Sequence, residues 1–93
     1  MDIHTYGVTT SRYDSCLTWG ESRLLVPVGP TLCLWNLETL SREKVFHYNS
    51  NAVMSLIQNT KLIFSICYNG EVAVIDRENL TLIKKFQAKG RTV

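Results

Sequence analysis

The chain has few of the residues from which catalytic and metal sites are built. Its 93 residues include two histidines and three cysteines, and the cysteines are Cys16, Cys33 and Cys67. Their wide spacing does not suit a zinc site, and their odd number does not suit a disulfide framework. We expect these thiols to be buried as small hydrophobic side chains. We expect His4 and His47 to be solvated or structural.

Motifs for catalysis and phosphate binding are missing as well. No Ser/His/Asp or Cys/His arrangement can be built from the sequence, and no glycine-rich phosphate loop occurs in it. We therefore expect a protein that is not an enzyme and that needs no cofactor, metal or small-molecule substrate.

Long apolar runs are absent too. No stretch of about 20 apolar residues occurs, so the sequence predicts no membrane-spanning helix and no membrane partner. The first residues have neither the cationic start nor the apolar core of a secretory signal, which favours a reducing compartment, the cytosol or the nucleus. The net charge of +2 is uneven, with −1 over residues 1–46 and +3 over residues 47–93. This excess permits contact with an acidic partner without requiring one.

What the chain does contain is a repeat. Trp35-Asn36 corresponds to Ile75-Asp76, and Phe46 corresponds to Phe86, each 40 residues further on. A period of roughly 40–45 residues with four short strands per unit is typical of the blades of a β-propeller. We expect an N-terminal extension over residues 1–12 and two blade-like repeats over 13–50 and 51–93. Because a propeller closes with about four to eight blades, we expect the chain to be the start of a longer propeller.

The predicted fold class is all-β, with antiparallel four-stranded blades. Gly29-Pro30 and Asn69-Gly70 are the strongest turn signals, and Asn-Gly between two β-rich runs predicts a tight hairpin. The predicted strands cover residues 15–19, 24–28, 31–37 and 44–48 in the first unit, and residues 52–57, 62–68, 71–76 and 80–86 in the second.

Side-chain alternation predicts sheets that are buried on both faces. In the third strand, Leu32 and Leu34 point to one face while Cys33 and Trp35 point to the other. A sheet with one solvated face would show polar residues on that side. We therefore expect Trp35 to be a core residue of stacked blades. A small two-sheet sandwich with a closed core is the alternative architecture.

The repeat, with Trp35-Asn36 and Ile75-Asp76 closing the third strands, resembles the WD-repeat propellers over about residues 13–93. The likeness is incomplete, because the usual Gly-His pair before each first strand is missing. Gly29-Pro30 and Asn69-Gly70 also replace the aspartate common between the second and third strands. The family's hydrogen-bond network from His through Ser/Thr and Asp to Trp therefore cannot be assembled. Trp35 and Ser65 are predicted to be isolated members of it.

Within that family, the run Leu24-Leu25-Val26-Pro27-Val28-Gly29 resembles the first blade of the periodic tryptophan proteins of the small-subunit processome. The likeness continues through Gly70–Ile75 and Leu82–Phe86. It implies a nucleolar scaffold that works with other protein subunits, pre-rRNA and a box C/D small nucleolar RNA particle in ribosome biogenesis. The alternative function is a generic protein-interaction propeller, in the cytoplasm, that takes part in trafficking or ubiquitin ligation.

One basic cluster is a candidate contact site for RNA or a partner protein. It lies in the second unit, is interrupted by Phe86, and consists of Lys84, Lys85, Lys89 and Arg91. Clustered cations suit a phosphate backbone, whose binding releases counterions. A solvated rim of the blade is the alternative interpretation of the same residues.

Overall fold

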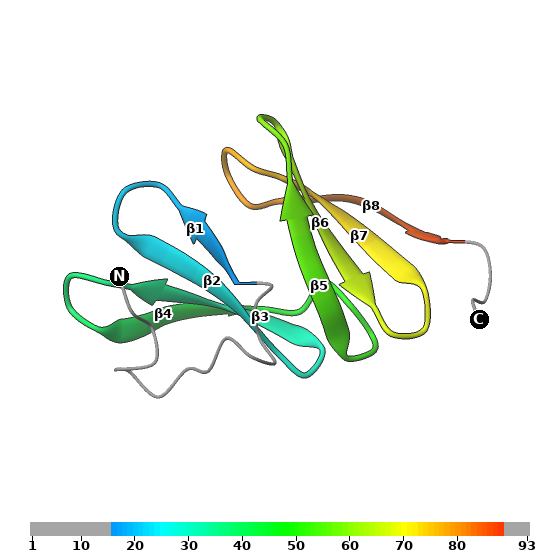
Figure 1. Ribbon diagram of the computed structural model, residues 1–93, viewed down its shortest axis with the longest axis horizontal. Helices are drawn as coiled ribbons and strands as arrows, with labels where there is room; N and C mark the ends of the chain where they lie inside the picture. Colours follow the sequence, from blue (N-terminus) through cyan, green and yellow to red (C-terminus); the bar gives the residue numbers. More distant parts are fainter. Residues whose placement is uncertain (1–15, 89–93) are drawn as a thin grey trace.

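The computed structural model describes residues 16–88, which form two antiparallel sheets of four strands each (Figure 1). The all-β class predicted from the sequence is therefore confirmed. In each sheet the strands follow one another in chain order. Sheet 1 consists of β1 (Leu17–Trp19), β2 (Arg23–Val28), β3 (Thr31–Asn36) and β4 (Ser41–Phe46), and sheet 2 of β5 (Val53–Gln58), β6 (Leu62–Cys67), β7 (Glu71–Asp76) and β8 (Leu82–Gln87). The described residues contain no helix that could cross a membrane.

Sheet 2 repeats the backbone of sheet 1 in register. Leu32 pairs with Phe46 in sheet 1, and Val72 pairs with Phe86 in sheet 2. Both sheets have a bulge two residues further along the third strand, after Leu34 and after Val74. In both, a leucine in the following turn has a positive φ, 58° at Leu40 and 61° at Leu80. The 40-residue period is thus a period of backbone geometry.

The predicted Asn69-Gly70 turn joins β6 to β7. Gly70 has a φ of +91°, a conformation that side chains with a Cβ rarely adopt. A Cβ at this position would also lie 2.8 Å from the Gln87 side chain. The Asn69 side chain accepts a hydrogen bond of 3.1 Å from the backbone N–H of Glu71, which closes the turn. Glycine is therefore required here by conformation, and a Cβ would in addition displace the end of the Gln87 side chain.

The hydrophobic core lies between the two sheets. Sheet 1 contributes the bulky side chains Leu25, Leu32 and Leu34. Sheet 2 and its turns contribute Leu56, Ile63, Ala73, Ile75 and Leu80, and Tyr48 joins them from the linker between the sheets. Strands β2 and β5 lie close together at one end of the interface, where the N–H of Val53 donates to the carbonyl oxygen of Gly29 over 2.9 Å. Each sheet thus buries one face against the other.

Two side chains hold the second sheet to the first by hydrogen bonds to its β7–β8 turn. The indole Nε1 of Trp19 donates to the carbonyl oxygen of Arg77 over 2.5 Å. The hydroxyl of Tyr48 donates to the carbonyl oxygen of Leu80, and its ring stacks on Phe46 with centroids 5.2 Å apart. The prediction of a strand over 44–48 is wrong at both ends, because β4 covers 41–46 and Tyr48 leaves the sheet to enter the core.

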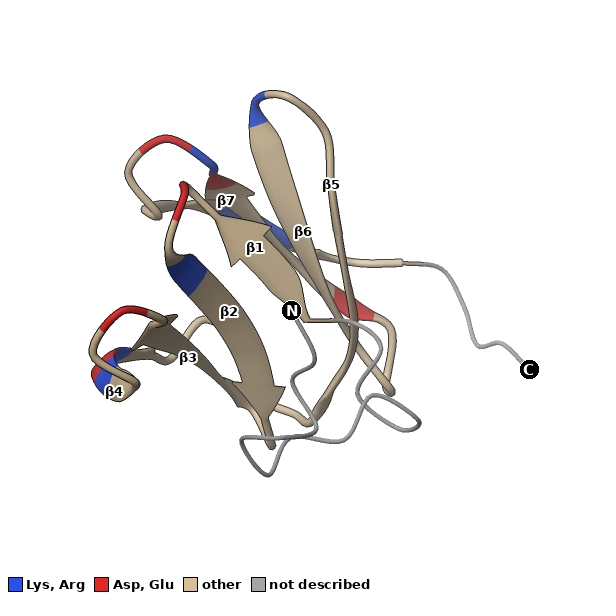
Figure 2. Ribbon diagram, turned by 60° about the vertical axis from the view of Figure 1, so that its left-hand side comes forward, with Lys and Arg blue, Asp and Glu red and all other residues tan. Residues whose placement is uncertain are grey.

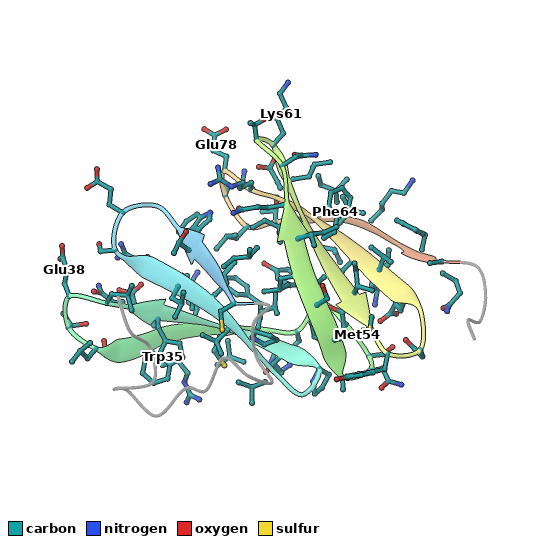
Figure 3. All side chains as sticks on the ribbon, in the orientation of Figure 1. Trp35, Glu38, Met54, Lys61, Phe64 and Glu78 are labelled. Carbon is teal, nitrogen blue, oxygen red and sulfur yellow. The ribbon has the colours of Figure 1, made fainter. Side chains whose placement is uncertain are left out.

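The prediction that Trp35 is a core residue is also wrong. Trp35 is half-buried and lies outside the core cluster, whereas Ile75, at the equivalent position in sheet 2, is fully buried. Figure 3 shows Trp35 projecting below sheet 1, on the side away from sheet 2. Alternation reveals which residues share a face, but it does not reveal which face another sheet covers.

Candidate interaction site

The predicted basic cluster does not form a single flat patch. Lys84 and Lys85 are neighbours on β8, the outer edge strand of sheet 2, so their side chains leave opposite faces. Lys84 is opposite Val74, and Lys85 is opposite Ala73. Both side chains are exposed. The remaining members of the cluster, Lys89 and Arg91, lie outside the described residues. A contact along the strand edge, rather than on one face, is the arrangement that both described lysines can reach.

Lys85 has a carboxylate beside it. Its Nζ lies 3.7 Å from an oxygen of Glu71, whose side chain is mostly buried. Glu71 also accepts a 3.0 Å hydrogen bond from the N–H of Ser50 and one of 3.3 Å from the amide of Asn49. These bonds stabilise the ionised form, so the pKa of Glu71 lies below its usual range, with the Ser50 backbone bond as the largest cause. Lys85 is therefore partly neutralised, while Lys84 has no ion-pair partner among residues 16–88.

Ser65 belongs to a hydrogen-bond network that the sequence did not predict. Its hydroxyl is fully buried and donates a 2.7 Å hydrogen bond to the side-chain oxygen of Asn49. Asn49 is itself buried, and its side-chain amide donates a 3.3 Å hydrogen bond to Glu71. The three side chains, which we call the polar clasp, tie the linker before β5 to strands β6 and β7. The sequence did not predict the clasp, for two reasons. Asn49 lies outside any strand, and Glu71 follows the β6–β7 turn, whereas the WD-repeat pattern has its acidic residue within that turn.

The cysteines within the strands are structural. Cys33 and Cys67 are buried, as predicted, and Cys67 donates to the carbonyl oxygen of Asn51 over 3.2 Å. Burial raises the pKa of the Cys67 thiol, which makes it a poor nucleophile. Cys16 is half-buried just before β1, and His47 is exposed; His4 lies outside the described residues. Among residues 16–88, no group of three His, Cys, Asp or Glu residues could hold a metal ion.

Sheet 1 has a polar network of a different kind, on its surface. Arg23 Nε lies 2.8 Å from a carboxylate oxygen of Glu43, and the amide of Asn36 donates to the same carboxylate over 2.9 Å. These bonds lower the pKa of Glu43, with Arg23 as the main cause. Figure 2 shows charged residues gathered at the turns and the outer strands, while the ribbons of β5 and β6 are tan over nearly their whole length. The charges of both signs are intermixed, as on an ordinary solvated rim.

A cleft of about 450 Å³ opens where the two sheets diverge. Trp19, Leu34 and Phe46 form its apolar wall, and Glu43, Lys44, Asn79 and Leu80 complete the lining. The Lys44 ammonium lies 5.9 Å from the centre of the Phe46 ring. Since Glu43 is already bound to Arg23, Lys44 is the charged group of this cleft that remains for a ligand.

Exposed apolar side chains gather mainly on sheet 2. The side of this sheet that faces away from sheet 1 is called the outer face below. Ile57 is 53% exposed and Phe86 45% exposed on it, and Phe64 is half-buried between them. Leu82 and Ile83 on β8 are also exposed. Concentrated apolar exposure of this kind marks an interaction surface more often than a catalytic one.

No known family model matches the chain, and no curated protein is significantly similar to it. The candidate site is therefore defined by its own chemistry: an exposed basic edge strand that borders an apolar sheet face.

Proposed function

We propose that the chain is a non-catalytic scaffold of the WD-repeat type that acts in ribosome biogenesis, in small-subunit processome assembly and pre-rRNA processing. The observation that supports the proposal is the repetition of register, bulge and turn conformation in the third and fourth strands of the two sheets. Units that repeat in this way stack in series, and serial stacking produces extended surfaces that suit protein and RNA partners. The residues from Leu24 to Gly29 that resemble the processome propellers form β2 and its turn.

The basic edge strand supports a ribonucleoprotein setting. Lys84 and Lys85 are exposed on β8, next to the strand end from which Lys89 and Arg91 continue the cluster in the sequence. Phosphate oxygens would compete with Glu71 for Lys85, while Lys84 has no such competitor in the described part of the chain. We therefore expect Lys84 to contribute more to RNA binding than Lys85.

The test begins with the location and the partners of the full chain. A tagged copy should concentrate in the nucleolus and co-purify with pre-rRNA and a box C/D small nucleolar RNA particle. The variant with Gln at Lys84, Lys85, Lys89 and Arg91 should show weaker crosslinking to RNA and a smaller dependence on salt, because fewer counterions are released. Glutamine is preferable to glutamate because a new carboxylate at position 85 would repel Glu71.

A matched control removes the same amount of charge elsewhere. Gln at Arg12, Arg42, Lys61 and Arg77 removes four cations that belong neither to the β8 cluster nor to the cleft. It should leave the RNA crosslinking unchanged if the β8 cluster is the contact. A chain found only in the cytosol, bound to trafficking or ubiquitin-ligase subunits, would contradict the processome proposal. The apolar outer face of sheet 2 favours that alternative, a general protein-interaction propeller.

A further inference from the structure

The cleft where the two sheets diverge is bordered by the core-facing side of sheet 1. Lys44 on β4 lies opposite Leu34 on β3, and Leu34 lies opposite Leu25 on β2, so the three side chains form a row on one face. Phe46, two residues after Lys44, lies on the same face. Leu25 and Leu34 are buried in the core, while Lys44 is exposed at the end of the row. Lys44 is therefore a cation at the margin of the core.

The other side of the cleft is formed by the β7–β8 turn, which contributes Asn79 and Leu80. Trp19, at the end of β1, completes the apolar lining. Its indole N–H is already bound to the carbonyl oxygen of Arg77, so the indole offers a ligand apolar surface only. A mostly apolar lining with a few polar groups and a volume of about 450 Å³ is typical of sites for small ligands.

The side-chain acceptors of the cleft are occupied within the chain. The two carboxylate oxygens of Glu43 accept hydrogen bonds of 2.8 and 3.2 Å from Arg23, and one of them also accepts from Asn36. The side-chain oxygen of Asn79 accepts from the N–H and from the hydroxyl of Thr81, over 3.2 and 2.7 Å. A ligand that offers donors would therefore have to compete for each of these acceptors.

The side-chain donors at the mouth of the cleft, in contrast, are unused. In the described part of the chain, neither the Lys44 ammonium nor the N–H₂ group of Asn79 donates a hydrogen bond or joins an ion pair. The ammonium is held over the Phe46 ring, 5.9 Å from its centre, and this ring stacks on Tyr48. These contacts orient the charge before a ligand arrives, which lowers the entropy cost of binding. The complementary ligand is therefore an anion with acceptor atoms.

The charges around the cleft indicate how much negative charge the ligand carries. Among the described residues that line it, Lys44 is the one cation, and the Glu43 carboxylate is its neighbour in the chain. RNA carries a negative charge on every nucleotide, and proteins that bind it neutralise several phosphates at once. One ammonium next to a carboxylate does not suit such a polyanion, but it suits a single carboxylate.

We propose that this cleft is a binding site for a carboxylate that is attached to one bulky apolar group. The apolar group lies against Trp19 and Phe46, and the carboxylate accepts hydrogen bonds from Lys44 and Asn79. The site goes beyond the scaffold function proposed above and does not depend on it. A free aromatic acid, and a peptide with an acidic residue beside an aromatic one, offer this same chemistry, so the experiment includes a probe for each source.

Nuclear magnetic resonance of the labelled full chain tests the proposal with phenylpropionate as the probe. The titration should shift the indole N–H signal of Trp19, which lines the cleft, but not that of Trp35, which projects away from sheet 2. A dissociation constant of about 1 mM is expected for a ligand of this size. Phenylpropanamide has nearly the same shape without the charge. It should bind about tenfold more weakly, because it cannot accept a hydrogen bond between two charged groups.

Two lysines at equivalent positions of the repeat provide matched variants. Lys44 lies opposite Leu34, as Lys84 lies opposite Val74. Lys44→Met should weaken phenylpropionate binding about tenfold and leave RNA crosslinking unchanged. Lys84→Met should leave phenylpropionate binding unchanged and weaken RNA crosslinking. The carboxylate site and the RNA contact can therefore fail independently of each other.

Asn79→Asp tests the second donor. The variant keeps the oxygen that accepts from Thr81, but it replaces the N–H₂ group with an oxygen that repels a carboxylate. Binding of phenylpropionate should be lost, while circular dichroism and the Trp35 signal should show an unchanged fold.

The peptide N-acetyl-Phe-Glu-amide distinguishes the two sources of the ligand. Tighter binding of this peptide than of phenylpropionate would assign the site to a partner polypeptide, and weaker binding would assign it to a free acid. Three results would overturn the proposal. These are a Trp19 signal that neither carboxylate probe shifts, equal binding of phenylpropionate and its amide, and a larger Trp19 shift with oligouridylate than with phenylpropionate. Wild-type affinity in Lys44→Met or in Asn79→Asp would contradict the role assigned to that residue.

Discussion

Sheet 1 and sheet 2 have the same backbone register but different chemistry at equivalent positions. In β6, Ser65 is fully buried and hydrogen-bonded to Asn49, whereas its equivalent in β2 is the apolar Val26. Glu71 begins β7 and completes the polar clasp, while Thr31 begins β3 and bonds only locally, to the carbonyl of Val28. The repeat therefore preserves strand pairing, and each sheet holds its connections by its own means.

The difference extends to the two faces of the sheets. The inner face of sheet 2 has one buried polar member, Ser65, and it is covered by sheet 1. Its outer face is largely apolar, with Ile57 and Phe86 exposed, but by register it also carries Lys84, which is opposite Val74. Sheet 1 carries its polar network at the surface, where Arg23 and Glu43 are both accessible to solvent. Buried hydrogen bonds contribute more to stability than exposed ion pairs, so we expect sheet 2 to depend more on its polar residues than sheet 1 does.

The largest expected effect separates Ile75 from Trp35. Ile75→Ala should lower the free energy of unfolding by about 2–5 kcal/mol, because Ile75 is fully buried and a cavity would remain. Trp35→Ala should cost less, since Trp35 is half-buried and lies outside the core cluster. Urea denaturation of both variants measures the difference. A larger loss for Trp35→Ala would return Trp35 to the core and contradict the assignment of faces.

The two left-handed leucines should respond in opposite directions to glycine. Leu40 is 50% exposed, so replacing its side chain loses little packing. Leu40→Gly should therefore raise stability by about 0.5–1 kcal/mol, which is the relief of backbone strain minus the entropy cost of glycine. Leu80 is buried in the core, so Leu80→Gly should lower stability by about 2 kcal/mol or more despite the same relief. Leu40→Ala, which retains a Cβ, is the control and should show no gain. Thermal unfolding resolves these signs.

Removing the hydroxyl from the polar clasp should have an intermediate effect. Ser65→Ala leaves the buried oxygen of Asn49 without its donor, which should cost about 1–3 kcal/mol. Asn49→Ala breaks the same bond from the other side. If the clasp acts as a unit, the double variant should cost clearly less than the sum of the single variants. Strict additivity in chemical denaturation would show that the two residues act independently.

The smallest expected effect is a dependence on pH. The pKa of Glu71 is lowered in the folded chain from its ordinary value of 4.5. Its contribution to stability is therefore complete above pH 4.5 and is lost as the pH falls through the lower, folded-state pKa. Melting temperatures between pH 6 and pH 3 should thus fall less steeply for Glu71→Gln than for the wild type. Glu43→Gln is the counterpart in sheet 1, and its effect should disappear in high salt because Glu43 is at the surface.

The strands could be predicted because their signals are local. Asn69-Gly70 and Gly29-Pro30 mark tight turns through their backbone preferences, and both turns occur where the pattern placed them. The 40-residue spacing between Phe46 and Phe86 predicted two equivalent units, which the strand registers match. The end of β4 was misplaced because Tyr48 resembles a strand residue but is drawn into the core by a contact with Leu80, 32 residues away.

The candidate site was only partly accessible to prediction. The sequence located the basic cluster. Only the structure shows that Lys84 and Lys85 lie on the outermost strand of sheet 2, where their side chains leave opposite faces. The polar clasp could not be predicted, because Asn49, Ser65 and Glu71 belong to three separate segments whose meeting is a property of packing.

The sequence by itself determined that the chain forms two similar antiparallel sheets, since the turn residues and the alternation of side chains act within a few residues of one another. Only the tertiary structure decided which faces meet. Both faces of each third strand are apolar, so alternation alone offers two equivalent ways to stack the sheets. The choice follows from long-range contacts, in which Trp19 and Tyr48 bind the β7–β8 turn and the leucines of sheet 1 share one core cluster with Ala73 and Ile75. That choice buries Ile75, leaves Trp35 half-exposed, and leaves Ile57 and Phe86 exposed on the outer face of sheet 2.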